Sequence, residues 1–193
     1  FIYNKKIMKN FLYFLLLTSY LGFSQSQINL EKSSVKWTGT QISGKSHYGT
    51  LSFKSADLKL EDGELTGASF VVDMTTLSVD DLSGKSKKSL EGHLASDDFF
   101  SVSEFQTSNL VLDKVSKTAE NKYFATGKLT IKGATHAAEI TFSRDQDLKR
   151  MTAKLIFDRS KYDVRYGSGS FFENLGNRLI LDDIELEVTL AMM

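Results

Sequence analysis

Apolar and polar residues alternate with a period of two along most of this chain. The clearest run is at 184–190, where Ile184, Leu186, Val188 and Leu190 alternate with acidic residues and a threonine. Alternation of this kind is typical of β-strands with one wet and one dry face. The same pattern recurs in Val35 and Trp37; Leu51 and Phe53; Leu58 and Leu60; Phe70, Val72 and Met74; Leu110 and Leu112; Tyr123, Ala125, Leu129 and Ile131; Ala138, Ile140 and Phe142; and Ala153, Leu155 and Phe157.

Short turn sequences separate these runs: "EDGE" at 61–64, "IKGAT" at 131–135 and "SRDQD" at 143–147. The pattern predicts about eight strands with antiparallel neighbours. Their dry faces can be buried in a sandwich or in a closed barrel, and periodicity alone does not choose. One helix is expected at about 83–94, capped by Ser83 or Ser86, and a second short helical turn at 171–176.

Residues 1–26 have the pattern of upstream residues followed by a cleaved signal peptide, and Met8 is the expected start. Lysines precede an apolar stretch that spans 11–23, and small residues follow it. That stretch is shorter than the roughly 20 residues a spanning helix needs. We expect cleavage after Ser24 or Ser26. The remaining residues, 27–193, contain no linker and are expected to form one domain.

Charge and cysteine content exclude several classes of function. The chain has 24 basic and 24 acidic residues, and removing the three lysines of 1–26 leaves a net charge of −3. A mildly acidic domain with no basic run argues against a nucleic-acid partner. The chain has no cysteine, which rules out thiol nucleophiles, redox motifs and cysteine-based zinc sites.

Histidines and serines give no strong sign of a metal site or of a catalytic nucleophile. His47, His93 and His136 are not at metal-ligand spacing. The chain has no Gly-x-Ser-x-Gly sequence, and "GSGS" at 167–170 lacks the lysine of a phosphate-binding loop. We expect no metal and no catalytic residue from these patterns.

The segment "LEGHLASDDFF" at 90–100 has two interpretations. In the first, His93 pairs with Asp97 or Asp98 as an acid–base site. In the second, the aspartates accept backbone N–H groups where the helix ends, while Phe99 and Phe100 close the apolar interior. The second is favoured because no nucleophile or oxyanion stabiliser accompanies the histidine.

The segment "FDRSKYDVRYGSGSFF" at 157–172 also has two interpretations. Its three cations alternate with acidic residues and tyrosines. The charges can pair with one another in a long loop, or Arg159, Lys161 and Arg165 can form a positive clamp for a phosphate or carboxylate head group at the mouth of a cavity. The residues leave both open.

Five segments in this order resemble the YceI-like family of exported bacterial proteins: "SSVKWTGT", "HYGTLSFKSADLKLEDGELTGASFVVDMTTL", "LEGHLASDDFFSVSEF", "GKLTIKGATH" and the closing stretch at 157–190. The resemblance implies an all-β fold, an eight-stranded antiparallel lipocalin-like barrel with one short α-helix at its end. It also implies an apolar channel over 27–193 that binds an isoprenoid or another long-chain lipid. The family supplies no catalytic residues, so an enzyme is not expected.

Together these inferences predict a periplasmic or secreted lipid-binding barrel that acts as a carrier or in stress protection. The expected ligand is a long-chain lipid, with no other cofactor and no nucleic acid. Transient contact with a membrane surface and a homodimer both stay open, as do an enzyme based on His93 and a surface that binds another protein. The residues expected to contact lipid are Trp37, Phe53, Phe70, Phe99, Phe100 and Phe157, with Arg159, Arg165 and Tyr166 near its head group.

Overall fold

The computed structural model of the protein describes residues 28–61, 64–147 and 149–193. The signal peptide expected at 1–26 lies outside them. Eight strands follow one another along the chain: β1 Ile28–Thr40, β2 Ser46–Glu61, β3 Glu64–Val79, β4 Thr107–Ala119, β5 Lys122–Ile131, β6 Ala134–Arg144, β7 Arg150–Asp158 and β8 Asp183–Met192. Helix α1 (Gly84–Ala95) follows β3, and the 3-10 turns η1 (Arg159–Tyr162) and η2 (Gly176–Arg178) lie between β7 and β8.

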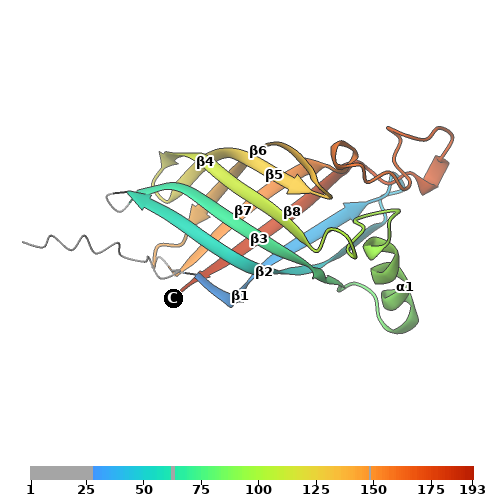
Figure 1. The fold of residues 1–193 in the computed structure, drawn as a ribbon, viewed down its shortest axis with the longest axis horizontal. Coiled ribbons are helices and arrows are strands. Elements are labelled where there is room, and N and C mark those ends of the chain that lie inside the picture. Colours follow the sequence, from blue (N-terminus) through green and yellow to red (C-terminus); the bar gives the residue numbers. More distant parts are fainter. Residues whose placement is uncertain (1–27, 62–63, 148) are drawn as a thin grey trace, which may run out of the picture.

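The strands form a closed antiparallel barrel (Figure 1). Each strand pairs with its neighbour in sequence, and β1 also pairs with β8, where Val35 lies opposite Val188. Closure gives each described strand a paired neighbour on both sides, which decides between the barrel and the sandwich that the periodicity left open. The all-β, lipocalin-like fold with one short α-helix is confirmed.

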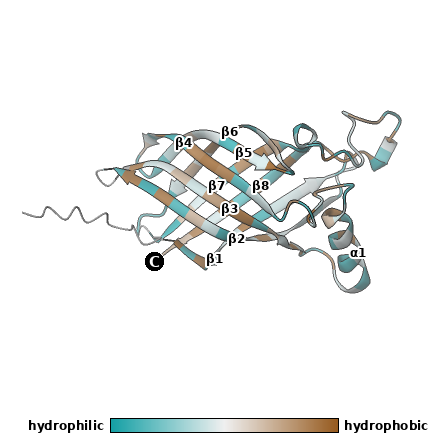
Figure 2. Ribbon diagram, viewed as in Figure 1, coloured by the Kyte–Doolittle hydropathy of each residue, from teal (hydrophilic) through white to brown (hydrophobic). Residues whose placement is uncertain are grey.

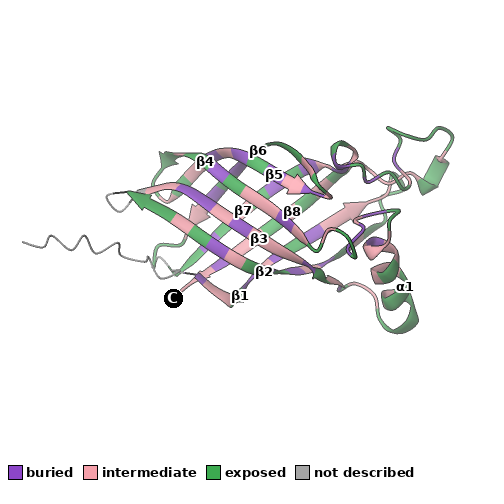
Figure 3. Ribbon diagram, viewed as in Figure 1, coloured by how far each residue is buried: buried purple, intermediate pink, exposed green. Residues whose placement is uncertain are grey.

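The dry face of the strands points into the barrel. Figure 2 shows apolar and polar residues alternating along the strands, and Figure 3 shows the matching alternation of buried and less buried positions. Trp37, Phe53, Phe70 and Phe157 are each less than a tenth exposed. Leu60 is an exception, since it is 39% exposed. The register between β2 and β3 shifts beside it, and such an irregularity changes which face a residue takes.

Helix α1 packs against β3 at one end of the barrel, called here the helix end (Figure 1). Among the residues described for the helix, Leu94 is the one that is buried. Glu91 accepts a hydrogen bond from the N–H of Val79 at 3.0 Å, which ties the helix to the last residue of β3. Ser83 is the N-cap residue, as expected, but its side chain makes no capping hydrogen bond.

The short helical turn expected at 171–176 is in the wrong place. Residues 171–175 are irregular, and a 3-10 turn begins only at Gly176. Asn174 has φ 58° and Gly176 has φ 54°. Positive φ values at these two positions are incompatible with a continuous right-handed helical turn over 171–176.

Candidate functional site: a channel inside the barrel

An apolar channel runs inside the barrel. Every strand contributes at least two apolar side chains to its wall, and Leu90 and Leu94 of α1 join them at the helix end. Its volume is about 200 Å³, counted as the space that the centre of a water molecule can reach. One water needs roughly 10–15 Å³ on this measure, so the channel has room for a ligand much larger than water.

All six aromatic residues predicted to contact lipid lie in this wall: Trp37, Phe53, Phe70, Phe99, Phe100 and Phe157. They are brought together from β1, β2, β3, β7 and the segment after α1. Phe53 and Phe70 lie on neighbouring strands with ring centroids 6.0 Å apart. The indole Nε1 of Trp37 donates to the carbonyl of Ser78 at 3.2 Å, which fixes the ring against β3. Contact with a ligand stays a prediction for all six.

Three polar residues continue the inward faces at the helix end: Gln41, His47 and Arg159. Gln41 follows β1, His47 is the second residue of β2, and Arg159 follows β7. They extend the alternation of Trp37 and Gly39, of Leu51 and Gly49, and of Leu155 and Phe157. The apolar wall therefore ends in a short polar section beneath the loops of the helix end.

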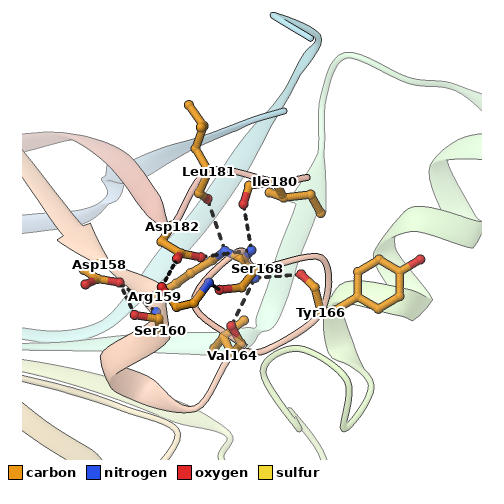
Figure 4. Close-up of polar contacts among 10 residues, drawn as sticks. Asp158, Arg159, Ser160, Val164, Tyr166, Ser168, Ile180, Leu181 and Asp182 are labelled. Carbon is orange, nitrogen blue, oxygen red and sulfur yellow. Dashed lines mark hydrogen bonds and ion pairs between the residues drawn. The ribbon is translucent and has the colours of Figure 1, made fainter. Parts of the chain in front are cut away.

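Arg159 is buried and is held by the chain itself (Figure 4). Its Nε donates to the carbonyl of Leu181, and its two terminal nitrogens donate to the carbonyls of Val164, Tyr166 and Ile180 at 2.9–3.1 Å. Burial lowers the pKa of the guanidinium, while the charges of two nearby aspartates oppose that change.

Asp182 supplies the charge that balances Arg159. Its Oδ1 lies 3.3 Å from a terminal nitrogen of Arg159, and its Oδ2 accepts a hydrogen bond from Ser170. A buried cation of this kind is typical of a structural role, because four of its five N–H groups donate to carbonyls and a carboxylate balances its charge. Arg159 thus joins η1, the loop after it and the start of β8.

Of the two interpretations that the residues of 157–172 left open, the structure favours the loop over the positive clamp. Arg159 lines the channel, but each of its nitrogens already has a partner. Arg165 is exposed, pairs with Asp163 and lies over the ring of Phe171. This segment matches the interpretation in which the charges of the loop pair with one another. Arg165 and Tyr166 are not part of the channel wall, and their contact with a head group stays a prediction.

His47 and Asp81 form a polar pair at the helix end that sequence reasoning missed. His47 Nδ1 lies 2.6 Å from Asp81 Oδ2, and Asp81 Oδ1 accepts the N–H of Tyr48 at 3.1 Å. Burial acts to raise the pKa of Asp81, but the hydrogen bonds from His47 and Tyr48 and the charge of His47 outweigh it, so the pKa is lowered. The carboxylate is therefore ionised near neutral pH and orients the imidazole.

A sequence profile described as the YceI-like domain matches residues 27–192. This chain belongs to the YceI-like family. A search of curated protein sequences finds no match.

Several solved structures resemble this YceI-like barrel. The crystal structure of Burkholderia cenocepacia BcnA has 22% identity and a TM-score of 0.66, and the match covers 86% of this chain and 99% of that one. The Campylobacter jejuni YceI protein has 19% identity and a TM-score of 0.52, and the match covers 73% and 82%. At these identities the likeness concerns the fold.

In this YceI-like barrel the segment after α1 forms a wall of the channel. His93 Nε2 lies 3.6 Å from Asp98 Oδ2, and its ring meets Phe99 and Tyr166 edge-on, with centroids 4.9 and 4.4 Å apart. The backbone carbonyl of Asp97 accepts a hydrogen bond from the side chain of Lys132. Among the hydrogen bonds of residues 28–61, 64–147 and 149–193, none joins the imidazole ring of His93 to a carboxylate or a hydroxyl.

The expectation that Asp97 and Asp98 accept backbone N–H groups at this corner is wrong. Backbone carbonyls accept them instead: the N–H groups of Phe100 and Val102 donate to Leu94 and Ala95. The hydroxyl of Ser96 donates to the carbonyl of His93 at 2.7 Å. The helix C-terminus is satisfied by the chain's own turn, which leaves the two aspartates exposed to solvent.

Three further observations concern possible metal ligands, the last histidine and membrane spans. The part of the chain that the structure describes holds no group of three His, Cys, Asp or Glu side chains able to bind a metal ion. His136 is exposed, and its Nε2 lies 2.8 Å from the carbonyl of Lys161. No helix of the described residues is long and apolar enough to cross a membrane.

Proposed function

We propose that this protein binds one long-chain lipid, an isoprenoid or another hydrocarbon chain, in the channel of the barrel. The observation that carries the proposal is the wall itself, to which all eight strands contribute apolar side chains and in which the described polar residues are Gln41, His47, Ser108, Asn109, Thr152 and Arg159. Each methylene that leaves water contributes about 0.8 kcal/mol, so about ten methylenes contribute roughly 8 kcal/mol before the costs of association and ordering. Such a wall needs no catalytic group to work.

The biological role that fits this proposal is that of a carrier or of a protein in stress protection outside the cytoplasm. The pattern of residues 1–26 and membership of the YceI-like family support the location. Binding in place of catalysis is supported by His93, whose ring is packed against aromatic rings.

Exposed apolar side chains at the helix end support transient contact with a membrane surface. Ile42, Tyr166, Phe171 and Phe172 are each at least 40% exposed. The backbone of Ile42 bonds to Leu179, so the turn between β1 and β2 adjoins the loop that carries the three rings. Aromatic rings at the end of a lipid channel suit the membrane–water interface. A homodimer stays a prediction.

Filling the channel tests the proposal. Ala153 lies in the wall on β7, and Ala153→Phe places a ring in the space of the hydrocarbon chain. If the ring displaces about two methylenes, binding of radiolabelled hexadecanol, measured by partition from dilute vesicles, falls roughly tenfold.

The matched control is Ile156→Phe, on the same strand but 60% exposed outside the barrel. It should bind hexadecanol as the parent does. Equal binding by the parent and both variants, all of them folded, would show that the hydrocarbon chain is not in the channel.

A further inference from the structure

Inside the barrel, there is open space beside His47. His47 lies opposite Gly39 on the neighbouring strand, and both face the channel. A Cβ built on Gly39 would meet only Ile184 Cδ1, at 3.6 Å, among the atoms that the structure describes. The absence of a side chain at Gly39 thus leaves room next to the imidazole, where the apolar wall gives way to polar groups.

Asp81 fixes which nitrogen of His47 is free. The ionised carboxylate only accepts hydrogen bonds, so Nδ1 carries the proton that faces it at 2.6 Å. Nε2 has no hydrogen-bond partner within the described part of the chain. In the neutral ring Nε2 accepts a hydrogen bond, and in the protonated ring it donates one. A hydroxyl group can form a hydrogen bond with Nε2 in either protonation state, because it can both donate and accept.

An anionic head group finds no free cation here. The described wall contains no lysine, and its single arginine, Arg159, is committed to four carbonyls and to Asp182. The charge of a protonated His47 is already balanced by Asp81. The side chains of His47 and Asp81 are 22% and 16% exposed, so a carboxylate or phosphate held there would lose much of its water without gaining a counterion, which is unfavourable.

From this geometry we infer that the polar section at the helix end binds an uncharged, hydroxyl-bearing head group, with His47 as its hydrogen-bond partner and Asp81 as the residue that orients His47. The inference rests on the proposed function, because it names the head group of the lipid in the same channel. Gln41 lines the same section and offers a second neutral polar group. The ligand class is therefore a long-chain alcohol, in preference to a fatty acid or an alkyl phosphate.

Four radiolabelled ligands of equal chain length test the inference: hexadecanol, hexadecanoate, hexadecyl phosphate and hexadecane. Each is partitioned between the purified full chain and dilute neutral vesicles. The parent protein is expected to prefer hexadecanol to either anion by at least about tenfold, since an uncompensated buried charge is costly. His47→Phe keeps a ring of similar size without the nitrogen. It is expected to weaken hexadecanol binding about five- to tenfold, the effect of one buried hydrogen bond, and to leave hexadecane within about twofold.

The outcomes separate this inference from the proposed function. If none of the four ligands binds the parent, the lipid channel itself is refuted. If hexadecane and hexadecanol bind but an anion binds as tightly as the alcohol, only the head-group inference is overturned. An equal change for alcohol and alkane in His47→Phe also overturns it, because His47 would then act through packing.

Should His47→Phe fail to fold, Gly39→Ala provides the same test without removing the imidazole. Its new methyl group makes an ordinary contact with Ile184 and occupies the space beside His47. Hexadecanol binding is expected to fall at least threefold more than hexadecane binding. Unchanged preference in this variant would place the head group elsewhere.

Discussion

Replacing Gly49 by alanine is expected to lower the free energy of unfolding by at least about 3 kcal/mol, because the new methyl group has no space. A Cβ on Gly49 would lie 1.7 Å from the carbonyl oxygen of Ser78 and 2.9 Å from Cζ2 of Trp37. The backbone of β3 would have to move, and the hydrogen bond from Trp37 to Ser78 would move with it. The measurement is denaturant unfolding, and the melting temperature should fall by roughly 6–12 °C.

Gly92→Ala is the control for this effect. Gly92 lies within α1, and apart from the helix's own backbone no described atom comes within 4 Å of a Cβ built there. Alanine is the better helix former, so this variant should be more stable than the parent by about 0.5–1 kcal/mol. If Gly49→Ala unfolds at the same denaturant concentration as the parent, the close approach of β2 and β3 at Gly49 is contradicted.

Arg159→Met is expected to lower the free energy of unfolding by about 3–5 kcal/mol. The change leaves four backbone carbonyls without their donors and Asp182 without its counter-charge. Residues 163–182 should lose protection first, because their carbonyls converge on the guanidinium (Figure 4). Amide hydrogen exchange of this loop, together with denaturant unfolding, measures both effects.

Two variants show whether the geometry of Arg159 matters beyond its charge. Arg159→Lys keeps the charge but lacks the planar fork, so it should recover only part of the lost stability. Arg165→Ala removes an exposed cation from the same loop and should change stability by no more than about 0.5 kcal/mol. Equal losses in Arg159→Met and Arg165→Ala would contradict the structural role of Arg159.

Much of the fold could be predicted from the sequence because burial has a period of two in strands. Nearly every apolar position of the alternating sets points inward, whereas Leu60 does not because the strand register shifts beside it. Closure of the barrel could not be derived from periodicity, since a sandwich buries the same face. It was implied only by the resemblance of the five segments to the YceI-like family.

The wall of the channel could be predicted better than its polar end. Trp37 and Phe157 follow from the alternation, which also carries through Gly49 to His47 and from Phe157 to Arg159. The partners of these polar residues do not follow, because Asp81 is 34 residues from His47 and the carbonyls around Arg159 come from a loop without regular pattern. For the same reason the sequence left the clamp and the self-paired loop both open: the partners that satisfy the charges of the loop are brought to them only by the fold.

Mass spectrometry of the protein purified from its own cells without detergent tests the central claim most directly. If the channel binds lipid, the native mass exceeds that of the bare chain by one long-chain molecule, and organic extraction releases that molecule in about equimolar amount. If the head-group inference also holds, the molecule is an uncharged alcohol. A native mass equal to that of the bare chain, with no long-chain compound in the extract, would contradict lipid binding in this barrel.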